Sequence, residues 1–293
     1  MKEKKKFGDR RDAKKIPMPA MLKLMTYIKD RQDAYVYINR KLDVTDLVQY
    51  MKEKKKKNPD LTYFHAFSTA IAKVIYNRPK LNTYIINHKC YQRYDVILTF
   101  TARVSFDDNG KEVMSLIKVD PNDNIFDLSN KIKEKVNIFR NKKEQNSSDD
   151  SLDALDKLPG WALKYFVAPI FKWMDRHDLL PRSLNDNLIY NSTVILSNLG
   201  SIKCGAIHHN LTNFGTNSII LTIGDIHKEQ VVMPNGKVEI RDIVEFGINL
   251  DERIADGVYM SKSVNLLDYI IRNPKTLEDK ANEIIKEKKD FEY

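Results

Sequence analysis

The sequence predicts a single α/β or α+β domain in which helices cover a mixed β-sheet. In some stretches apolar residues alternate with a period of two, while in others they follow a helical period. The two kinds of stretch succeed one another irregularly along the chain. Two short sequences, DDNG at 107–110 and NG at 235–236, are typical of tight hairpin turns. No internal repeat interrupts this pattern.

The chain is expected to consist of a basic lead-in, residues 1–16, and one domain over residues 17–293. A buried helix is predicted over 60–78, because apolar residues form one stripe along it and Pro79 follows. The other elements expected in the N-terminal half are a helix over 21–28, a strand over 33–44, a helix from Asp43 or Thr45 to the lysines at 52–57, strands over 94–106 and 111–120, and an amphipathic helix over 124–143.

The C-terminal half is expected to complete the sheet and to end in helices. Strands are recognised by short alternating runs, and the NG turn joins two of them into a hairpin. The expected elements are strands over 192–198, 218–226, 229–233, 237–241 and 243–250, and helices over 261–273 and 275–289.

Residues 147–187 differ in composition from the rest and are interpreted as an apolar helical insertion. An acidic break is followed by a stretch rich in aromatic residues. Lys164, Pro169 and Lys172 argue against a membrane span. Three interpretations remain: a kinked helix packed on the body, a lid over an apolar substrate channel, or contact of residues 159–175 with a membrane surface or a partner.

The net charge of +9 comes mainly from two lysine-rich runs, residues 2–6 and 52–57. Neither run has the interleaved aromatic residues or glycine spacing typical of nucleic-acid binding. A solvated lysine face is therefore favoured, and no nucleic-acid partner is expected. The same charge can steer an anionic small molecule toward the protein.

Cys90 and Cys204 are the only cysteines, and they lack the spacing of a disulfide framework or a metal site. No metal is therefore expected. The N-terminus has no apolar signal region, and no stretch reaches 18 continuous apolar residues. We expect a cytoplasmic protein.

The stretch NLDERIADG, residues 249–257, places four charged side chains between a strand and a helix. One explanation is local, because acidic residues favour the first turn of a helix. The neighbouring stretches suggest another. They are TVILSNLGSI at 193–202, SIILTIGDI at 218–226, VEFGINLDERIADG at 244–257 and YIIRNPKTLE at 269–278.

This ordered set resembles the catalytic domain of the dihydrolipoyl acyltransferases of 2-oxo acid dehydrogenase complexes and, more distantly, chloramphenicol acetyltransferase. The resemblance extends over about residues 18–280. It implies a two-layer, chloramphenicol acetyltransferase-like fold with a mixed sheet flanked by helices. It also implies a homotrimer with active sites between subunits, which coenzyme A and the acyl partner reach from opposite sides.

In that family the stretch reads Asp-His-Arg-x-x-Asp-Gly, and the histidine takes the thiol proton of coenzyme A. Asp251, Arg253, Asp256 and Gly257 match this pattern, but Glu252 stands at the histidine position. The ordinary pKa of a glutamate lies about 4 units below that of a thiol, which makes it a poor replacement base. The resemblance places Asp256 and Glu252 in the candidate site.

Ser197 lies where the family has a hydroxyl that stabilises the tetrahedral oxyanion. The alternative is a serine that satisfies a turn amide. His208 and His209 follow on a loop that in the family lies beside the same interface. A neutral imidazole suits a thiol proton, so one of them is a candidate relocated base, while ordinary structural histidines remain the alternative.

The resemblance implies coenzyme A or an acyl-CoA as substrate. The chain is expected to be a stand-alone form without lipoyl and subunit-binding domains. Lipoamide then takes part only if a separate lipoylated carrier protein supplies it. We expect coenzyme A-dependent acyl transfer; the alternative is a catalytically inactive trimeric scaffold or acyl-CoA-binding pseudoenzyme. The sequence identifies neither the acyl group nor its acceptor.

Overall fold

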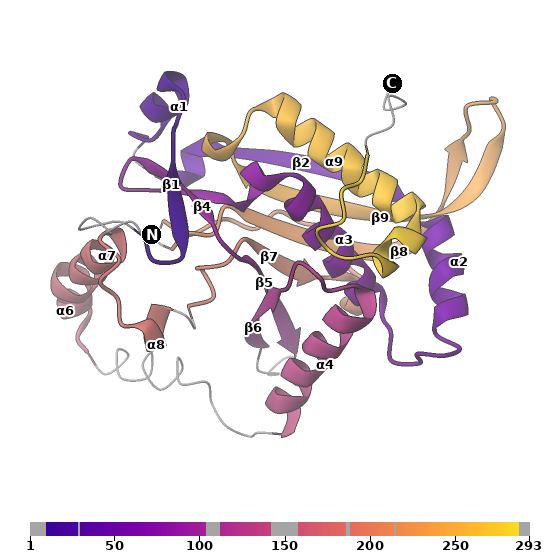
Figure 1. Ribbon diagram of the computed structural model, residues 1–293, viewed down its shortest axis with the longest axis horizontal. Helices are drawn as coiled ribbons and strands as arrows, with labels where there is room; N and C mark the ends of the chain where they lie inside the picture. The colour runs from indigo at the N-terminus through magenta and orange to yellow at the C-terminus, as the bar shows by residue number, and fades with distance from the viewer. Residues whose placement is uncertain are drawn as a thin grey trace.

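A computed structural model describes residues 10–28, 30–103, 112–141, 158–185, 188–213 and 215–286. Its central feature is a mixed six-stranded sheet with the strand order β2-β9-β8-β7-β5-β6 (Figure 1). The strands are β2 (Tyr35–Asp43), β5 (Val96–Arg103), β6 (Glu112–Val119), β7 (Val194–Asn198), β8 (Ile219–Val232) and β9 (Val238–Asp251). Strand β7 runs parallel to β5 and β8, and the other pairs are antiparallel.

One face of this sheet packs against helices and forms the main hydrophobic core. The helices are α2 (Thr45–Lys54), α3 (Tyr63–Asn77), α4 (Ile125–Asn141) and α9 (Gly257–Arg272). Figure 1 shows α3 and α9 lying across the sheet. The predicted mixed sheet with flanking helices is therefore confirmed.

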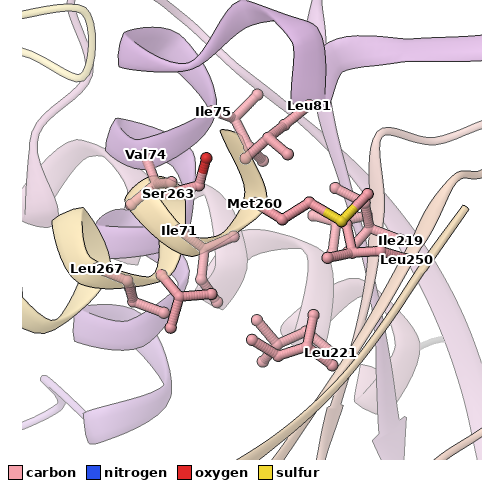
Figure 2. Close-up of a pocket in the computed structure, with 13 residues that line it drawn as sticks. Ile71, Val74, Ile75, Leu81, Ile219, Leu221, Leu250, Met260, Ser263 and Leu267 are labelled. Atoms are coloured by element: carbon pink, nitrogen blue, oxygen red, sulfur yellow. The ribbon is translucent and has the colours of Figure 1, made fainter. Parts of the chain in front are cut away.

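A cavity of about 50 Å³ lies between α3, α9 and the sheet (Figure 2). Ile71, Leu267 and Met260 are among the apolar side chains around it. Ser263, a polar residue at its wall, donates a hydrogen bond to the carbonyl of Tyr259 (2.7 Å). This cavity is a packing defect in the core, and it is smaller than the pockets that hold substrates.

A smaller sheet closes one end of the molecule and consists of β1 (Ala13–Ile16), β4 (Lys89–Arg93) and β3 (Thr83–Ile86). The sequence pattern did not predict this sheet. Its strand β1 comes from the segment interpreted as a basic lead-in, and Arg10 and Ala13 are buried there. Residues 10–16 therefore pack with the domain, whereas the expected first helix is the short α1 (Ala20–Met25).

Two other predictions are wrong near the C-terminus. The strands expected over 218–226 and 229–233 are the single strand β8, and those over 237–241 and 243–250 are β9. Gly236 in the connecting turn has a φ of 79°, in agreement with the predicted NG hairpin. The DDNG turn lies outside the described residues, although β5 and β6 pair antiparallel on either side of it.

The helix expected over 275–289 is also wrong for the residues that the structure describes. A 3₁₀ turn, Pro274–Glu278, follows α9, and no helix continues from there to residue 286. The buried ammonium of Lys73 donates to the carbonyls of Asp279 (3.2 Å) and Lys280 (2.6 Å). Because these carbonyls bind a side chain of α3, they do not take part in a helical ladder.

The described part of the insertion, residues 158–185, contains one long helical run. It consists of α6 (Gly160–Ala162), a π-helical turn (Leu163–Val167) and α7 (Ala168–Arg176), followed by the short α8 (Arg182–Asn185). A π turn accommodates an extra residue within a helix. The chain therefore stays helical through the region of Pro169, where a kinked helix was one of the expected arrangements.

His65 lies in the first turn of α3 and is held as a neutral ring in the core. Its Nδ1 accepts the backbone N–H of Thr62 (3.2 Å) and lies 2.9 Å from the hydroxyl oxygen of Ser129. Burial lowers the pKa of His65 from 6.5 to about 4. The native state therefore favours the uncharged form of this ring.

We expect this histidine to make folding stability depend on pH. Because its folded-state pKa is depressed, the contribution is complete above about pH 6.5 and is lost as the pH falls toward 4. The free energy of unfolding should drop by about 3 kcal/mol over that window from this group alone. Urea unfolding of the wild type and of His65→Gln at several pH values measures the effect. If the unfolding free energies of the two proteins depend equally on pH, the effect does not come from His65.

Candidate active site

The face of the sheet opposite the helices contains a row of four register partners. Ser197 of β7 pairs with Thr222 of β8, Thr222 with Gly247 of β9, and Gly247 with Asn39 of β2. Their neighbours along the strands, such as Leu196 and others in the main core, point toward the helices. Because side chains alternate along a strand, the four partners share the opposite face.

The loop 203–211 lies directly on this face. The hydroxyl of Thr222 donates to the carbonyl of Ile207, and the backbone N–H of Asp225 donates to the carbonyl of Cys204 (3.1 Å). Glycine permits this close approach, since a Cβ on Gly247 would lie 2.6 Å from the carbonyl oxygen of Ile207. A Cβ on Gly224 would lie 2.9 Å from another backbone atom of the loop.

The loop places His208 between the side chains of two asparagines. Its Nδ1 is hydrogen bonded to Oδ1 of Asn249 on β9. Its Nε2 lies 2.7 Å from Oδ1 of Asn39 on β2. The ring of Tyr37 contacts the imidazole edge to face, with centroids 5.3 Å apart.

The contacts of Asn249 decide which ring nitrogen of His208 carries the proton. This asparagine is buried, and its Nδ2 donates to the carbonyl of His209. Its Oδ1 must therefore face His208 and accept a proton from Nδ1. Nε2 faces Oδ1 of Asn39, and because this amide is exposed it can present either its oxygen or its nitrogen to the ring.

His209 lies differently from its neighbour. Its backbone carbonyl holds Asn249, while its half-buried side chain makes no hydrogen bond among the residues that the structure describes. The two adjacent histidines are therefore not equivalent. The sequence alone did not distinguish them.

Asp251 and Arg253 form a buried ion pair at the end of β9. Nε and Nη2 of Arg253 donate to the two carboxylate oxygens of Asp251 (2.7 and 2.6 Å). Burial lowers the pKa of Arg253, but its hydrogen bonds with Asp251 raise the pKa above the ordinary value overall. A second arginine, Arg31, lies 3.9 Å from the same carboxylate and also binds the carbonyl of Thr212, the residue that directly follows the loop (3.1 Å).

Glu252 lies between these buried partners, but its side chain is exposed. It makes no hydrogen bond or ion pair within the described part of the chain.

Asp256 is the N-cap of α9, and its carboxylate accepts the backbone N–H of Tyr259 (2.8 Å). That hydrogen bond lowers the pKa of Asp256, with a smaller contribution from Lys80 at 4.0 Å. The side chain is exposed. Helix capping, the local explanation for an acid at this position, is thus what the structure shows for Asp256.

Ser197 and His208 lie on the same face but not beside each other. Three strand spacings separate Ser197 from Asn39, the residue at Nε2 of His208, which amounts to about 14 Å. The Ser197 side chain is half-buried, and its hydroxyl makes no hydrogen bond among the described residues. One copy of the chain therefore does not bring Ser197 and His208 to a common reacting atom.

Asn39, Asn249 and Arg31 are site residues that sequence reasoning missed. Asn249 gave a detectable signal, because it is a polar residue inside the apolar strand run IVEFGINL. A buried asparagine in a strand needs hydrogen-bond partners, and here they are the two histidine residues of the loop. Asn39 lies in an exposed strand position and gave no such signal.

Comparison with known proteins finds a family model that is similar to part of this chain. Residues 179–278 match the model of the 2-oxoacid dehydrogenases acyltransferase catalytic domain. The matched region contains Ser197, His208, His209, Glu252 and Asp256, and the resemblance seen in the sequence is confirmed.

A curated relative extends the similarity to most of the chain. The lipoamide acyltransferase component of the branched-chain alpha-keto acid dehydrogenase complex from Bacillus subtilis is 22% identical over 269 residues. The alignment covers 89% of this chain and 52% of the relative. The chain thus spans about half the length of that protein.

Solved structures share the fold at low identity. Dihydrolipoamide acetyltransferase from Azotobacter vinelandii, a protein in whose catalytic mechanism the roles of a serine, a histidine and an asparagine have been investigated, is 14% identical. Its TM-score is 0.59, with 90% of this chain and 93% of that chain covered. Chloramphenicol acetyltransferase is 10% identical with a TM-score of 0.56, covering 89% and 98%. The chain has the chloramphenicol acetyltransferase-like fold.

The close approach of the loop to β9 predicts that Gly247→Ala disrupts the site. The added methyl group must displace the carbonyl of Ile207 or the Thr222 side chain, at a cost of about 1–3 kcal/mol in unfolding free energy. Gly205→Ala in the same loop is the matched control, because its Cβ would meet nothing within 4 Å. Denaturant unfolding of both variants checks this, and equal stabilities would mean that the loop does not lie on the sheet.

Proposed function

We propose that this protein is a coenzyme A-dependent acyltransferase of the 2-oxoacid dehydrogenase type in which His208 is the general base. The observation that supports this role is the fixed orientation of the imidazole, with Nδ1 bonded to Asn249 and Nε2 directed to the exposed edge at Asn39. An imidazole held in one tautomer is prepared to accept a proton.

In the proposed reaction Nε2 of His208 takes the proton of a thiol, and the sulfur attacks the carbonyl carbon of an acyl thioester. The carbonyl oxygen becomes an oxyanion, to which the Ser197 hydroxyl donates a hydrogen bond. Collapse of the tetrahedral intermediate expels the second thiolate, which recovers the proton from His208. Coenzyme A is one thiol, and a lipoamide on a separate carrier protein is a candidate for the other.

The distance of about 14 Å between Ser197 and Asn39 supports a site shared between subunits. In this proposal the chain forms a homotrimer, and Ser197 of one copy faces His208 of the next. The buried Asp251–Arg253 pair then has a structural role, since it fixes the end of β9 and, through Arg31, the end of the loop.

One observation favours a second candidate, a catalytically inactive scaffold that binds acyl-CoA or a partner. Glu252 occupies the position of the family histidine and is exposed, so the family base itself is absent. The scaffold candidate and the relocated-base candidate differ in whether any acyl-CoA is turned over.

Substitution of the two histidines should distinguish the relocated-base candidate from the scaffold candidate by activity. His208→Ala should lower the rate of acyl exchange between acyl-CoA and a thiol by about 10²–10⁴-fold, because a general base is lost. His209→Ala, the adjacent control, and Glu252→Gln should change the rate little. The rates of acyl exchange are measured for each variant with several acyl-CoA thioesters. The oligomer mass of each variant is measured alongside.

Two results would contradict the assignment. If Glu252→Gln is inactive while both histidine variants retain activity, the glutamate is the base. If the wild type binds coenzyme A but turns over none of the thioesters, the scaffold candidate is correct.

A site shared between subunits predicts complementation between two inactive variants. Light scattering should first give a mass about three times 34.2 kDa. Refolding Ser197→Ala together with His208→Ala should then restore activity at about a quarter of the interfaces, those that combine the two intact residues. Mixing Ser197→Ala with the double variant is the control and should restore nothing. Equal activity in both mixtures would place the site within one subunit.

A further inference from the structure

The helical run of residues 160–176 exposes a large apolar surface. Trp161, Tyr165, Phe166, Ile170 and Trp173 are each more than half exposed. Trp161 and Trp173 are the only two tryptophans in the sequence. Figure 1 shows α6 and α7 at one end of the molecule, beside the N-terminal segment and away from the helices that cover the main sheet.

The C-terminal end of this run is fixed to the body by two acidic residues. Asp175 and the following Asp178 are buried. Asp178 binds the guanidinium of Arg11 (2.9 Å), and Asp175 lies 3.6 Å from Arg10. These contacts orient the run and leave its aromatic side facing outward.

Because the acids face inward, the outward surface carries positive charge only. Lys164, Lys172 and Arg176 are exposed among the aromatic residues. Asp175 is the only acidic residue between 158 and 177, and it is buried. An apolar helix face bordered by cations, with tryptophan and tyrosine at its surface, has the composition of a helix that lies in a membrane interface.

We propose that residues 160–176 dock this protein onto a membrane surface that contains anionic lipid. The run is about 25 Å long, and none of its residues before Asp175 is buried, so its apolar side chains are open to a headgroup region along its length. The aromatic side chains enter the interface, and the three cations meet lipid phosphates. No helix among the described residues is long and apolar enough to cross a membrane, in keeping with surface attachment.

The charge also argues against the face being a symmetric contact with a second copy. Such a contact would bring Lys164, Lys172 and Arg176 of each copy close to the same cations of the other. Like charges so placed repel each other, and the described acids of the run are already paired internally. An anionic surface complements this face, whereas a copy of itself does not.

Intrinsic fluorescence tests the proposal directly, because both tryptophans lie on the face. Mixing the full chain with vesicles containing about 30% phosphatidylglycerol should shift the emission to shorter wavelength and sediment the protein with the lipid. Phosphatidylcholine vesicles should do neither. Added salt should weaken binding, as expected for charge attraction at a surface.

Three double variants give the controls. Trp161→Ser with Phe166→Ser should lose sedimentation, and the remaining Trp173 keeps the emission measurable. Lys164→Glu with Lys172→Glu should lose the preference for anionic vesicles. Met21→Ser with Leu24→Ser removes the exposed apolar side chains of α1 and should bind like the wild type. The native oligomer mass confirms that each variant is folded.

Three results would overturn the proposal. The first is the absence of sedimentation with any vesicle. The second is equal binding to both lipid compositions. The third is an emission that is already shifted in buffer and varies with protein concentration, which would show that the face is buried against another protein copy. Acyl transfer plays no part in these measurements, so they are independent of the proposed function.

Discussion

The structure of the candidate site depends on the absence of side chains at Gly224 and Gly247. These two glycines lie on adjacent strands of the sheet, and the loop 203–211 passes over both at a distance that leaves no room for a Cβ. The hydrogen bond from Thr222 to the loop carbonyl is possible only at this separation. The orientation of His208 between Asn249 and Asn39 follows from it. The two glycines therefore allow the loop to pack directly against the sheet, and this packing positions the residues of the candidate site.

Buried ion pairs hold the surrounding segments in place. The Asp251–Arg253 pair fixes the end of β9, and Arg31 connects that carboxylate to the loop through the carbonyl of Thr212. In the small sheet, which contacts the turn after β9, Arg93 binds Asp12 (2.8 Å) and ties β4 to the N-terminal segment. Removing one member of such a pair leaves an uncompensated charge in the core, which is strongly destabilising. These pairs thus specify geometry at places where apolar packing alone would allow several arrangements.

The sequence was most informative where local pattern and tertiary structure agree. The helix at Tyr63–Asn77 and the strands of the main sheet have clear periodicities, and the fold class followed from them. The expected C-terminal helix is absent from residues 279–286, and the carbonyls of Asp279 and Lys280 accept hydrogen bonds from Lys73 of α3, a distant contact that the local pattern does not reveal. The small sheet was missed because its strands are only four or five residues long. His208 and His209 were not separable, since the distinction comes from Asn249 on another strand.

The exposed position of Glu252 has a consequence for how this protein can change over evolutionary time. The backbone around it is held by Asp251 and Arg253, whose side chains are almost entirely buried, while the side chain of residue 252 projects into solvent. Exchange of residue 252 therefore has little effect on folding. A reactive group at residue 252 can therefore be lost or gained by substitution without disturbing the fold. Folding at this point depends on Asp251 and Arg253, whereas reactivity depends on residue 252, so the two properties can change independently.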